Sequence, residues 1–232
     1  MMNETIIGVI GGMGPEATAD FYMKIVKGTK VKRDQDHYHV IIDSNAKIPD
    51  RTRAILHGEE SPLPEIIRTA RRLGDQGVTV AAIPCLTSHY FIEDIQKSVD
   101  YQILNIFEEV AKYIETQYPD VKKVGVLATN GTVSMGLFDK YLKHVQILYP
   151  EAKVQNERVM EAIYGERGIK SGVLTGKPVG YLSEASEILA EQGAELIIMG
   201  CTEVGLALKQ EHVSLPLIDP LDVAVGVLTR KP

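Results

Sequence analysis

The chain repeats a strand–turn–helix pattern in its second half, and this repeat constrains the possible folds more than any other feature. Gly8–Ile10 and Gly125–Leu127 each precede a turn rich in small residues, and the two runs begin 117 positions apart. Leu73–Gly77 matches Leu189–Gly193 at an offset of 116. Two further pairs follow in the same order: Cys85–Thr87 with Cys201–Glu203, and Gln102–Ile106 with Leu215–Ile218. We interpret the repeat as a duplication of one α/β unit.

Short apolar runs alternate with longer helical patterns along the whole chain. The runs that predict strands are Ile6–Ile10, His39–Asp43, Val78–Pro84, Lys123–Ala128 and Glu195–Met199. The segments that predict helices are Ala17–Lys27, Leu63–Leu73, Phe107–Tyr118, Phe138–Leu148 and Ser183–Glu191. Alternation of this kind is typical of an α/β fold with parallel sheets. We expect two similar domains related by pseudo-two-fold symmetry, formed by residues 1–100 plus 208–232 and by residues 101–207.

Composition excludes several classes of protein. The 232 residues are 44% hydrophobic and 24% charged, as in ordinary globular proteins. The net charge of −6 argues against binding to nucleic acid or to anionic membranes. The apolar run at Ile6–Ile10 is too short for a secretory signal, and none approaches the roughly 20 residues that span a bilayer. We therefore expect a cytoplasmic protein with reduced thiols.

The two cysteines, Cys85 and Cys201, occupy equivalent positions in the repeat. Each ends an apolar strand and precedes a predicted helix. Because ligands of α/β sheets bind beyond the carboxyl ends of the strands, we expect the two thiols on opposite sides of one cleft. Such a pair could remove and return a proton on either face of one carbon. The alternative is that both cysteines are small core residues, which is common for free cysteine.

Hydroxyl groups and a helix start adjoin each cysteine. Thr87 and Ser88 follow Cys85, and Thr202 follows Cys201. These hydroxyls could cap a helix or bind a carboxylate. The amide groups at a helix N-terminus lower the pKa of a nearby thiol, so the positions favour a stabilised thiolate.

A set of motifs spanning nearly the whole chain resembles the aspartate/glutamate racemase family. The motifs, in the family's order, are Ile7–Thr18, Asp43–Asn45, Ile48–Thr52, Pro84–His89 and Met199–Glu203. The resemblance implies two α/β domains, a homodimer, no cofactor and no metal. It also implies one catalytic cysteine from each domain, at Cys85 and Cys201.

The resemblance implies the substrate contacts as well. Arg51 and Lys170 match the family's basic residues. The residues at positions that resemble its ligand-lining loops are Met13, Leu86, Thr87, Ser88, Thr202 and Glu203. Leu86 departs from the family pattern, which often has asparagine directly after the first cysteine. This departure affects the identity of the substrate more than the proton transfer.

Three other patterns have competing interpretations. Gly12–Ala17 fits the dinucleotide-binding pattern G-x-G-x-x-A, and Asp43 stands where a ribose-binding acid would. Lys170 could carry pyridoxal phosphate, although no motif supports this. His37, His39 and His89 could bind a metal only if they converge, and packing or capping is the simpler interpretation.

We therefore expect a cofactor-independent racemase of acidic amino acids, with aspartate preferred and glutamate possible. Its partner is a small-molecule amino acid, bound through its α-carboxylate by loop amides and hydroxyls and through its distal carboxylate by Arg51, Lys170 or both. The alternatives are a related enzyme, such as a maleate isomerase, a hydantoin racemase or an arylmalonate decarboxylase, and a non-catalytic binder of acidic metabolites.

Overall fold

A computed structural model describes residues 5–230 and divides the chain into two compact units. Among the described residues, unit 1 comprises 5–106 and 221–230, and unit 2 comprises 107–220. The sequence placed these boundaries after residues 100 and 207, which would assign the fourth strand of each sheet to the other domain.

Unit 1 is built on four parallel strands in the order β2-β1-β3-β4. The strands are β1 (Ile6–Gly11), β2 (His39–Ser44), β3 (Val80–Ala82) and β4 (Gln102–Ile103). The helices are α1 (Pro15–Gly28), η1 (Asp34–Asp36), α2 (Arg51–His57), α3 (Leu63–Asp75), η2 (Leu86–Phe91), α4 (Ile92–Gln96) and α12 (Pro220–Leu228).

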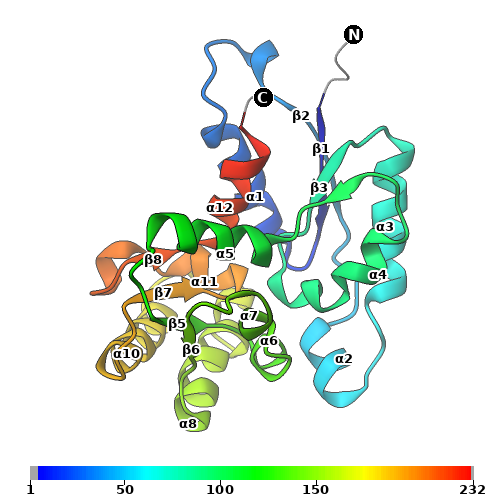
Figure 1. Ribbon diagram of the computed structural model, residues 1–232. Helices are drawn as coiled ribbons and strands as arrows, with labels where there is room; N and C mark the ends of the chain where they lie inside the picture. Colours follow the sequence, from blue (N-terminus) through cyan, green and yellow to red (C-terminus); the bar gives the residue numbers. More distant parts are fainter. Residues whose placement is uncertain (1–4, 231–232) are drawn as a thin grey trace. The chain divides into compact units, whose positions relative to one another are not determined.

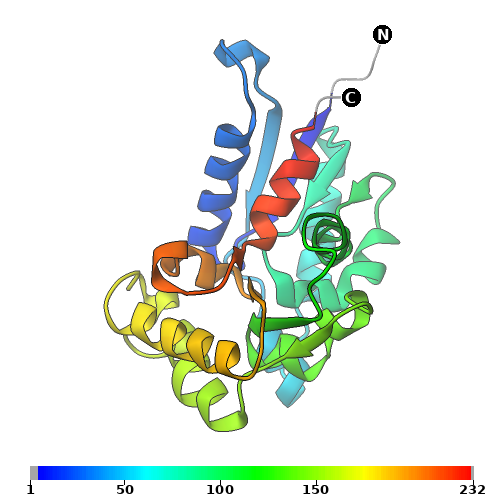
Figure 2. The same cartoon turned by 60° about the vertical axis from the view of Figure 1, so that its left-hand side comes forward.

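Helices cover both faces of this sheet. In Figure 1, α1 and α12 lie on one side of β1, and α3 and α4 lie on the other. Figure 2 shows α12 alongside α1, where Lys24 donates a hydrogen bond of 2.5 Å to Asp222. Burial on both faces explains why β1 is apolar throughout, as expected for a central parallel strand.

Unit 2 repeats the arrangement with four parallel strands in the order β6-β5-β7-β8. The strands are β5 (Lys123–Leu127), β6 (Gln146–Leu148), β7 (Leu196–Met199) and β8 (Leu217–Ile218). The helices are α5 (Ile106–Gln117), α6 (Asn130–Ser134), α7 (Leu137–Tyr141), α8 (Ala152–Val154), the π-helical η3 (Gln155–Met160), α9 (Glu161–Tyr164), η4 (Ile169–Ser171), α10 (Lys177–Glu191), α11 (Thr202–Ala207) and η5 (Gln210–His212).

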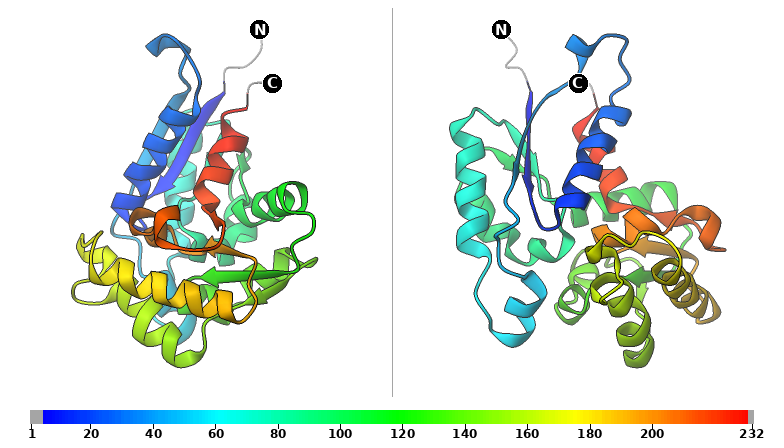
Figure 3. Two further views of the ribbon diagram at one scale, coloured as in Figure 1. Left: turned by 90° about the vertical axis from the view of Figure 1, so that its left-hand side faces the viewer. Right: turned by 180° about the vertical axis from the view of Figure 1, so that it is seen from behind.

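The core of unit 2 forms where helices pack on its sheet. Buried side chains of β5 and β7 pack with those of α9, α10 and α11. Figure 3 shows α10 running beside the helical segment of residues 152–164. The rings of Phe107 of α5 and Phe138 of α7 pack with a tilt of 58° at 4.7 Å between centroids.

The duplication extends to individual hydrogen bonds. Gly77 and Gly193 have positive φ and end α3 and α10, which are equivalent helices. The amide of the next residue bonds back to Leu73 O in unit 1 and to Leu189 O in unit 2. This 6→1 bond is typical of a helix that ends at glycine. The expected α/β fold with two similar parallel sheets is therefore confirmed.

One predicted helix is wrong in its second half. The segment expected to be helical over 138–148 ends its helix at Tyr141, and Gln146–Leu148 forms strand β6. Pairing with β5 at the sheet edge decides this conformation. Such a short apolar run is ambiguous between helix and strand when only local periodicity is considered.

Candidate functional site

Cys85 lies beyond the carboxyl end of β3, in unit 1. It is 6% exposed and directly precedes η2, so the helix expected after Cys85 is a 3₁₀-helix. Its carbonyl oxygen accepts hydrogen bonds from Ser88 N at 3.2 Å and from His89 Nδ1 at 3.1 Å. Among the described residues, its Sγ has no hydrogen bond.

The imidazole of His89 fixes the turn that carries Cys85. Its Nε2 accepts from Ile106 N at 3.3 Å, so Nδ1 carries the proton and donates to Cys85 O. The ring is 2% exposed, and burial lowers the pKa of His89 to about 4. The sequence did not predict that His89 fixes this turn, although His89 follows Cys85 by four residues. His37 lies before β2, whereas His39 is the first residue of this strand, so the two do not share a strand face.

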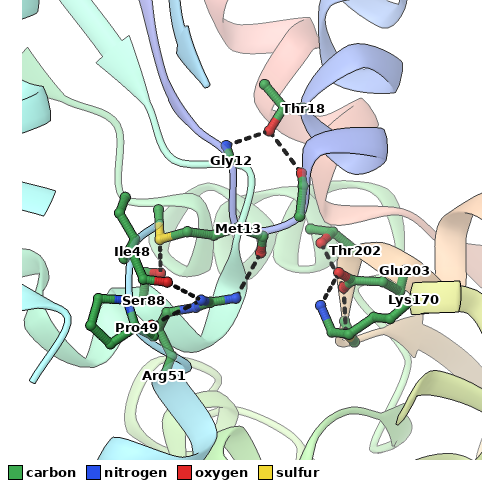
Figure 4. Close-up of polar contacts among 12 residues, drawn as sticks. Gly12, Met13, Thr18, Ile48, Pro49, Arg51, Ser88, Lys170, Thr202 and Glu203 are labelled. Carbon is green, nitrogen blue, oxygen red and sulfur yellow. Dashed lines mark hydrogen bonds and ion pairs between the residues drawn. The ribbon is translucent and has the colours of Figure 1, made fainter. Parts of the chain in front are cut away.

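Met13 and Ser88 meet beside this turn. Ser88 is fully buried, and its hydroxyl donates to Met13 Sδ at 3.3 Å (Figure 4). Thioether sulfur is a weak acceptor, so the Ser88 hydroxyl could exchange this bond for one to a carboxylate. Leu86 and Thr87 are also buried in η2.

Arg51 is the first residue of α2. Asp50 caps this helix by accepting from Arg53 N at 2.8 Å. The guanidinium is buried and donates to Met13 O at 3.1 Å and Pro49 O at 3.0 Å, with a longer bond of 3.5 Å to Ile48 O (Figure 4). Arg51 therefore joins the loop after β1 to the start of α2.

The glycine-rich loop after β1 is explained by packing. Gly12 has a φ of +91°, and a Cβ there would lie 2.3 Å from the backbone of Asn45. Its amide donates to Thr18 Oγ1 at 2.9 Å, a contact that the sequence analysis did not anticipate. Asp43, the expected ribose-binding acid, instead forms an ion pair of 2.6 Å with Arg72. These contacts give the dinucleotide-like pattern a structural role.

Cys201 occupies the equivalent position in unit 2, beyond β7 and at the N-cap of α11. It is 6% exposed, and its Sγ donates to Glu203 Oε2 at 3.0 Å. Burial and the Glu203 carboxylate raise the pKa of the Cys201 thiol well above its ordinary value, while Lys170 lowers it in part. The expectation that the helix start would stabilise a thiolate is wrong for the resting state, because burial outweighs it.

Lys170, whose side chain is partly exposed, forms an ion pair with the buried carboxylate of Glu203 in unit 2. The ammonium of Lys170, on η4, bonds to Glu203 Oε1, while Thr202 Oγ1 donates to Oε2 at 3.1 Å (Figure 4). Burial alone would raise the pKa of Glu203, yet Lys170 and the Cys201 hydrogen bond hold it below its ordinary value. The sequence named all three residues as substrate contacts, and the structure adds that they contact one another.

The loop after β5 is part of the candidate site, but none of the site residues predicted from the sequence lies in it. Gln155 is buried on η3, and its Nε2 donates to Ala128 O at 2.8 Å and Asn130 Oδ1 at 2.9 Å. The match between this turn and the glycine-rich turn after β1 was the available clue. Because β5 pairs with β7, the loop lies next to Gly200 and Cys201.

The described residues contain no cluster of three or more histidine, cysteine, aspartate or glutamate side chains able to hold a metal. Nor does any helix within residues 5–230 combine the length and apolar character needed to cross a membrane.

Known proteins resemble this chain over almost its full length. It is 27% identical to the broad specificity amino-acid racemase RacX of Bacillus subtilis over 224 residues, which cover 92% of each protein. The fold matches Picrophilus torridus aspartate racemase at a TM-score of 0.82, with 24% identity and coverage of 97% and 92%. It also matches Francisella tularensis glutamate racemase at 0.66, with 20% identity and coverage of 97% and 80%.

A family profile covers the same region of the chain. The profile described as Asp/Glu/hydantoin racemase matches residues 10–228, which include both cysteines and every loop described above. The chain therefore belongs to the Asp/Glu/hydantoin racemase family and is an isomerase of the amino-acid racemase type.

Proposed function

We propose that the protein racemises an amino acid without a cofactor, by proton transfer between Cys85 and Cys201. The observation that carries the proposal is the equivalent placement of the two thiols. Each is a nearly buried residue at a strand's carboxyl end, followed by a helical turn, in one of two duplicated units. Two-base chemistry requires the thiols to flank one carbon, which stays a prediction.

In the proposed reaction one thiolate takes the α-proton and the other thiol returns a proton from the opposite face. Removal of the proton places negative charge on the α-carbon and the adjoining carboxylate. Hydroxyl and amide donors around that carboxylate would stabilise this charge. We assign this role to Thr87, Ser88 and Thr202, with Met13 and Leu86 lining the substrate's path. The proposed enzyme is a cytoplasmic homodimer.

We propose an acidic amino acid, preferably aspartate, as the substrate, because the guanidinium of Arg51 could meet a second carboxylate. The relative from B. subtilis is named for broad specificity, and Lys170 is paired with Glu203 inside unit 2. These two observations favour broad specificity as a second candidate.

The test is incubation of the purified protein with each L-amino acid in D₂O, after treatment with a chelator and without added pyridoxal phosphate. Formation of the D-enantiomer with deuterium at the α-carbon supports the proposal. Conversion of maleate or a hydantoin instead would assign a related isomerase. Binding of acidic metabolites with no turnover would indicate a binder.

The choice between the two substrate candidates rests on Arg51. If its guanidinium recognises the second carboxylate, Arg51→Ala lowers kcat/KM for aspartate far more than for alanine. Equal losses with both amino acids would favour broad specificity.

A further inference from the structure

Glu203 has every carboxylate oxygen engaged within its own unit. It is 5% exposed, and it binds Lys170 through Oε1 and both Cys201 Sγ and Thr202 Oγ1 through Oε2. These three partners occupy most of the roughly four acceptor positions of an ionised carboxylate. Its geometry suits contact with the thiol better than contact with a substrate.

Lys170 also has its contacts within unit 2. It comes from η4, 33 residues before Glu203 in the sequence, and its Nζ also lies 5.2 Å from the centre of the Tyr164 ring. Turning Lys170 toward a substrate carboxylate would leave Glu203 charged and buried without its counter-ion, which is strongly unfavourable. The ion pair as a whole carries no net charge, so it offers no preference for an acidic side chain.

Few charged groups within unit 2 lie close enough to the Cys201 thiol to influence its pKa. Burial raises the pKa of the thiol most, and the charged groups that shift this pKa are Glu203, which raises it, and Lys170, which lowers it. Two charged groups lie beside Gly205 of α11: Lys209 donates to Gly205 O at 2.6 Å, and Asp219 approaches from the segment after β8. Both lie further along the helix, away from its cysteine end.

We propose that Glu203 exchanges the Cys201 proton and that Lys170 keeps Glu203 ionised, so that Lys170 serves proton transfer and not recognition of the substrate's side-chain charge. The proposal rests on the proposed racemase function. The Sγ–H bond breaks and an Oε2–H bond forms, which leaves a thiolate to take the substrate's α-proton. In the opposite direction Sγ gives its proton to the α-carbon and regains one from Oε2. Lys170 is thus a positioning residue that acts through Glu203.

The first experiment needs no substrate. The ultraviolet absorbance of the Cys201 thiolate is titrated in the Cys85→Ser background. Lys170→Met should raise the titration midpoint by about 1 unit or more, because an opposite charge close to the pair is lost. Glu203→Gln should lower the midpoint, because a neighbouring negative charge is lost. Lys209→Met, at the other end of α11, is the matched control and should leave the midpoint unchanged.

The second experiment measures turnover with one dicarboxylic and one neutral amino acid in the Cys85-containing protein. Lys170→Met and Glu203→Gln should each reduce kcat about 100-fold or more, as loss of a general acid–base group does. For each variant the loss should be the same factor with every amino acid that the unmodified protein racemises. Lys170→Arg should restore most of the rate, and far-ultraviolet circular dichroism verifies that each variant is folded.

Three results would overturn the proposal: a Cys201 midpoint unmoved by Lys170→Met, a loss confined to dicarboxylic substrates, or full activity of folded Glu203→Gln. If the unmodified protein racemises nothing but the midpoints shift as expected, the proposed function fails while the link between Lys170, Glu203 and the thiol stands.

Discussion

The two cysteines occupy the same place in the duplicated fold but have different chemical surroundings. In unit 1 the turn after Cys85 is held through the backbone by the neutral ring of His89. In unit 2 the Cys201 thiol itself donates to a buried carboxylate, which is balanced by Lys170. Duplication therefore preserved the position of the thiols and not the means of controlling their protons.

This difference shows that the fold sets the position of each thiol, whereas its neighbouring side chains control its protonation. The parallel sheets bring each cysteine to the carboxyl end of an inner strand, whichever side chains surround it. The protonation of each thiol then depends on a few neighbouring residues. We expect the two half-reactions of racemisation to depend differently on pH. Four sets of substitutions test the differences between the two units.

Replacing either thiol should have the largest effect. Cys85→Ser and Cys201→Ser should each reduce racemisation by about 10²- to 10⁴-fold, because a hydroxyl is too weak an acid and base near neutral pH. Each variant should still exchange the α-proton of one enantiomer with D₂O, measured by NMR. We expect Cys85 to serve the D-enantiomer and Cys201 the L-enantiomer. Racemisation at the original rate by either variant would refute the two-thiol mechanism.

His89 should make the stability of unit 1 sensitive to acid. An unfolded histidine titrates near 6.5, whereas the folded-state pKa of His89 is about 4. As pH falls from 6.5 to 4, only the unfolded state gains this proton, so the free energy of unfolding should drop by about 3 kcal/mol. His89→Gln should flatten this slope in urea titrations at several pH values.

The matched control is His57→Gln, which removes an exposed imidazole from α2. If the slope of the His89→Gln variant equals that of the original protein, the acid sensitivity arises elsewhere.

Arg51 and Lys170 are cations with different partners. The buried guanidinium of Arg51 is held by carbonyl groups, whereas Lys170 pairs with a carboxylate. Loss of its bonds to Met13 O and Pro49 O in Arg51→Ala should lower the free energy of unfolding by about 2 kcal/mol. Arg51→Lys should cost less, because an ammonium can keep one of the two bonds. Chemical denaturation measures both values, and an unchanged stability of Arg51→Ala would show that the loop after β1 does not depend on the guanidinium.

The smallest effects should come from the start of the inner strands, where the repeat again differs. Thr79 Oγ1 accepts from Ile6 N at 3.0 Å, and Glu195 Oε2, at the equivalent position, accepts from Lys122 N at 2.6 Å and Lys123 N at 2.8 Å. Thr79→Val should reduce the unfolding free energy by about 1 kcal/mol at every pH.

Glu195→Gln should instead change the pH dependence of Tm. The two backbone hydrogen bonds lower the pKa of Glu195, so its stabilising contribution is present at neutral pH and is lost on acidification through that lowered pKa. Scanning calorimetry at neutral and acidic pH should show a smaller loss of Tm on acidification for Glu195→Gln. An identical response of the two proteins would contradict the role of the charge.

The sequence predicted the longer elements because each has a strong local pattern. Five strands and the main helices were expected close to their observed places. It missed β4, β6 and β8, which have only two or three residues and form by pairing with a neighbouring strand. Strands this short carry almost no periodicity, so tertiary pairing decides their conformation.

The sequence predicted which residues belong to the candidate site, but not which of them contact one another. Lys170 and Glu203 were both expected near a substrate, yet no local pattern shows that residues 33 positions apart form an ion pair. The partners of Arg51 were equally hidden, because Met13 lies 38 residues before it. Contacts of this kind follow from packing, which spacing along the sequence does not reveal.

The return of the chain to unit 1 has a consequence for biosynthesis. Helix α12 follows the whole of unit 2 in the sequence, yet it packs on α1 through Lys24 and Asp222. On the ribosome, all strands and helices of unit 2 emerge before the helix that completes one face of the first sheet. Unit 2 can therefore complete its core first, and nascent unit 1 must wait with part of its apolar surface uncovered until translation reaches α12.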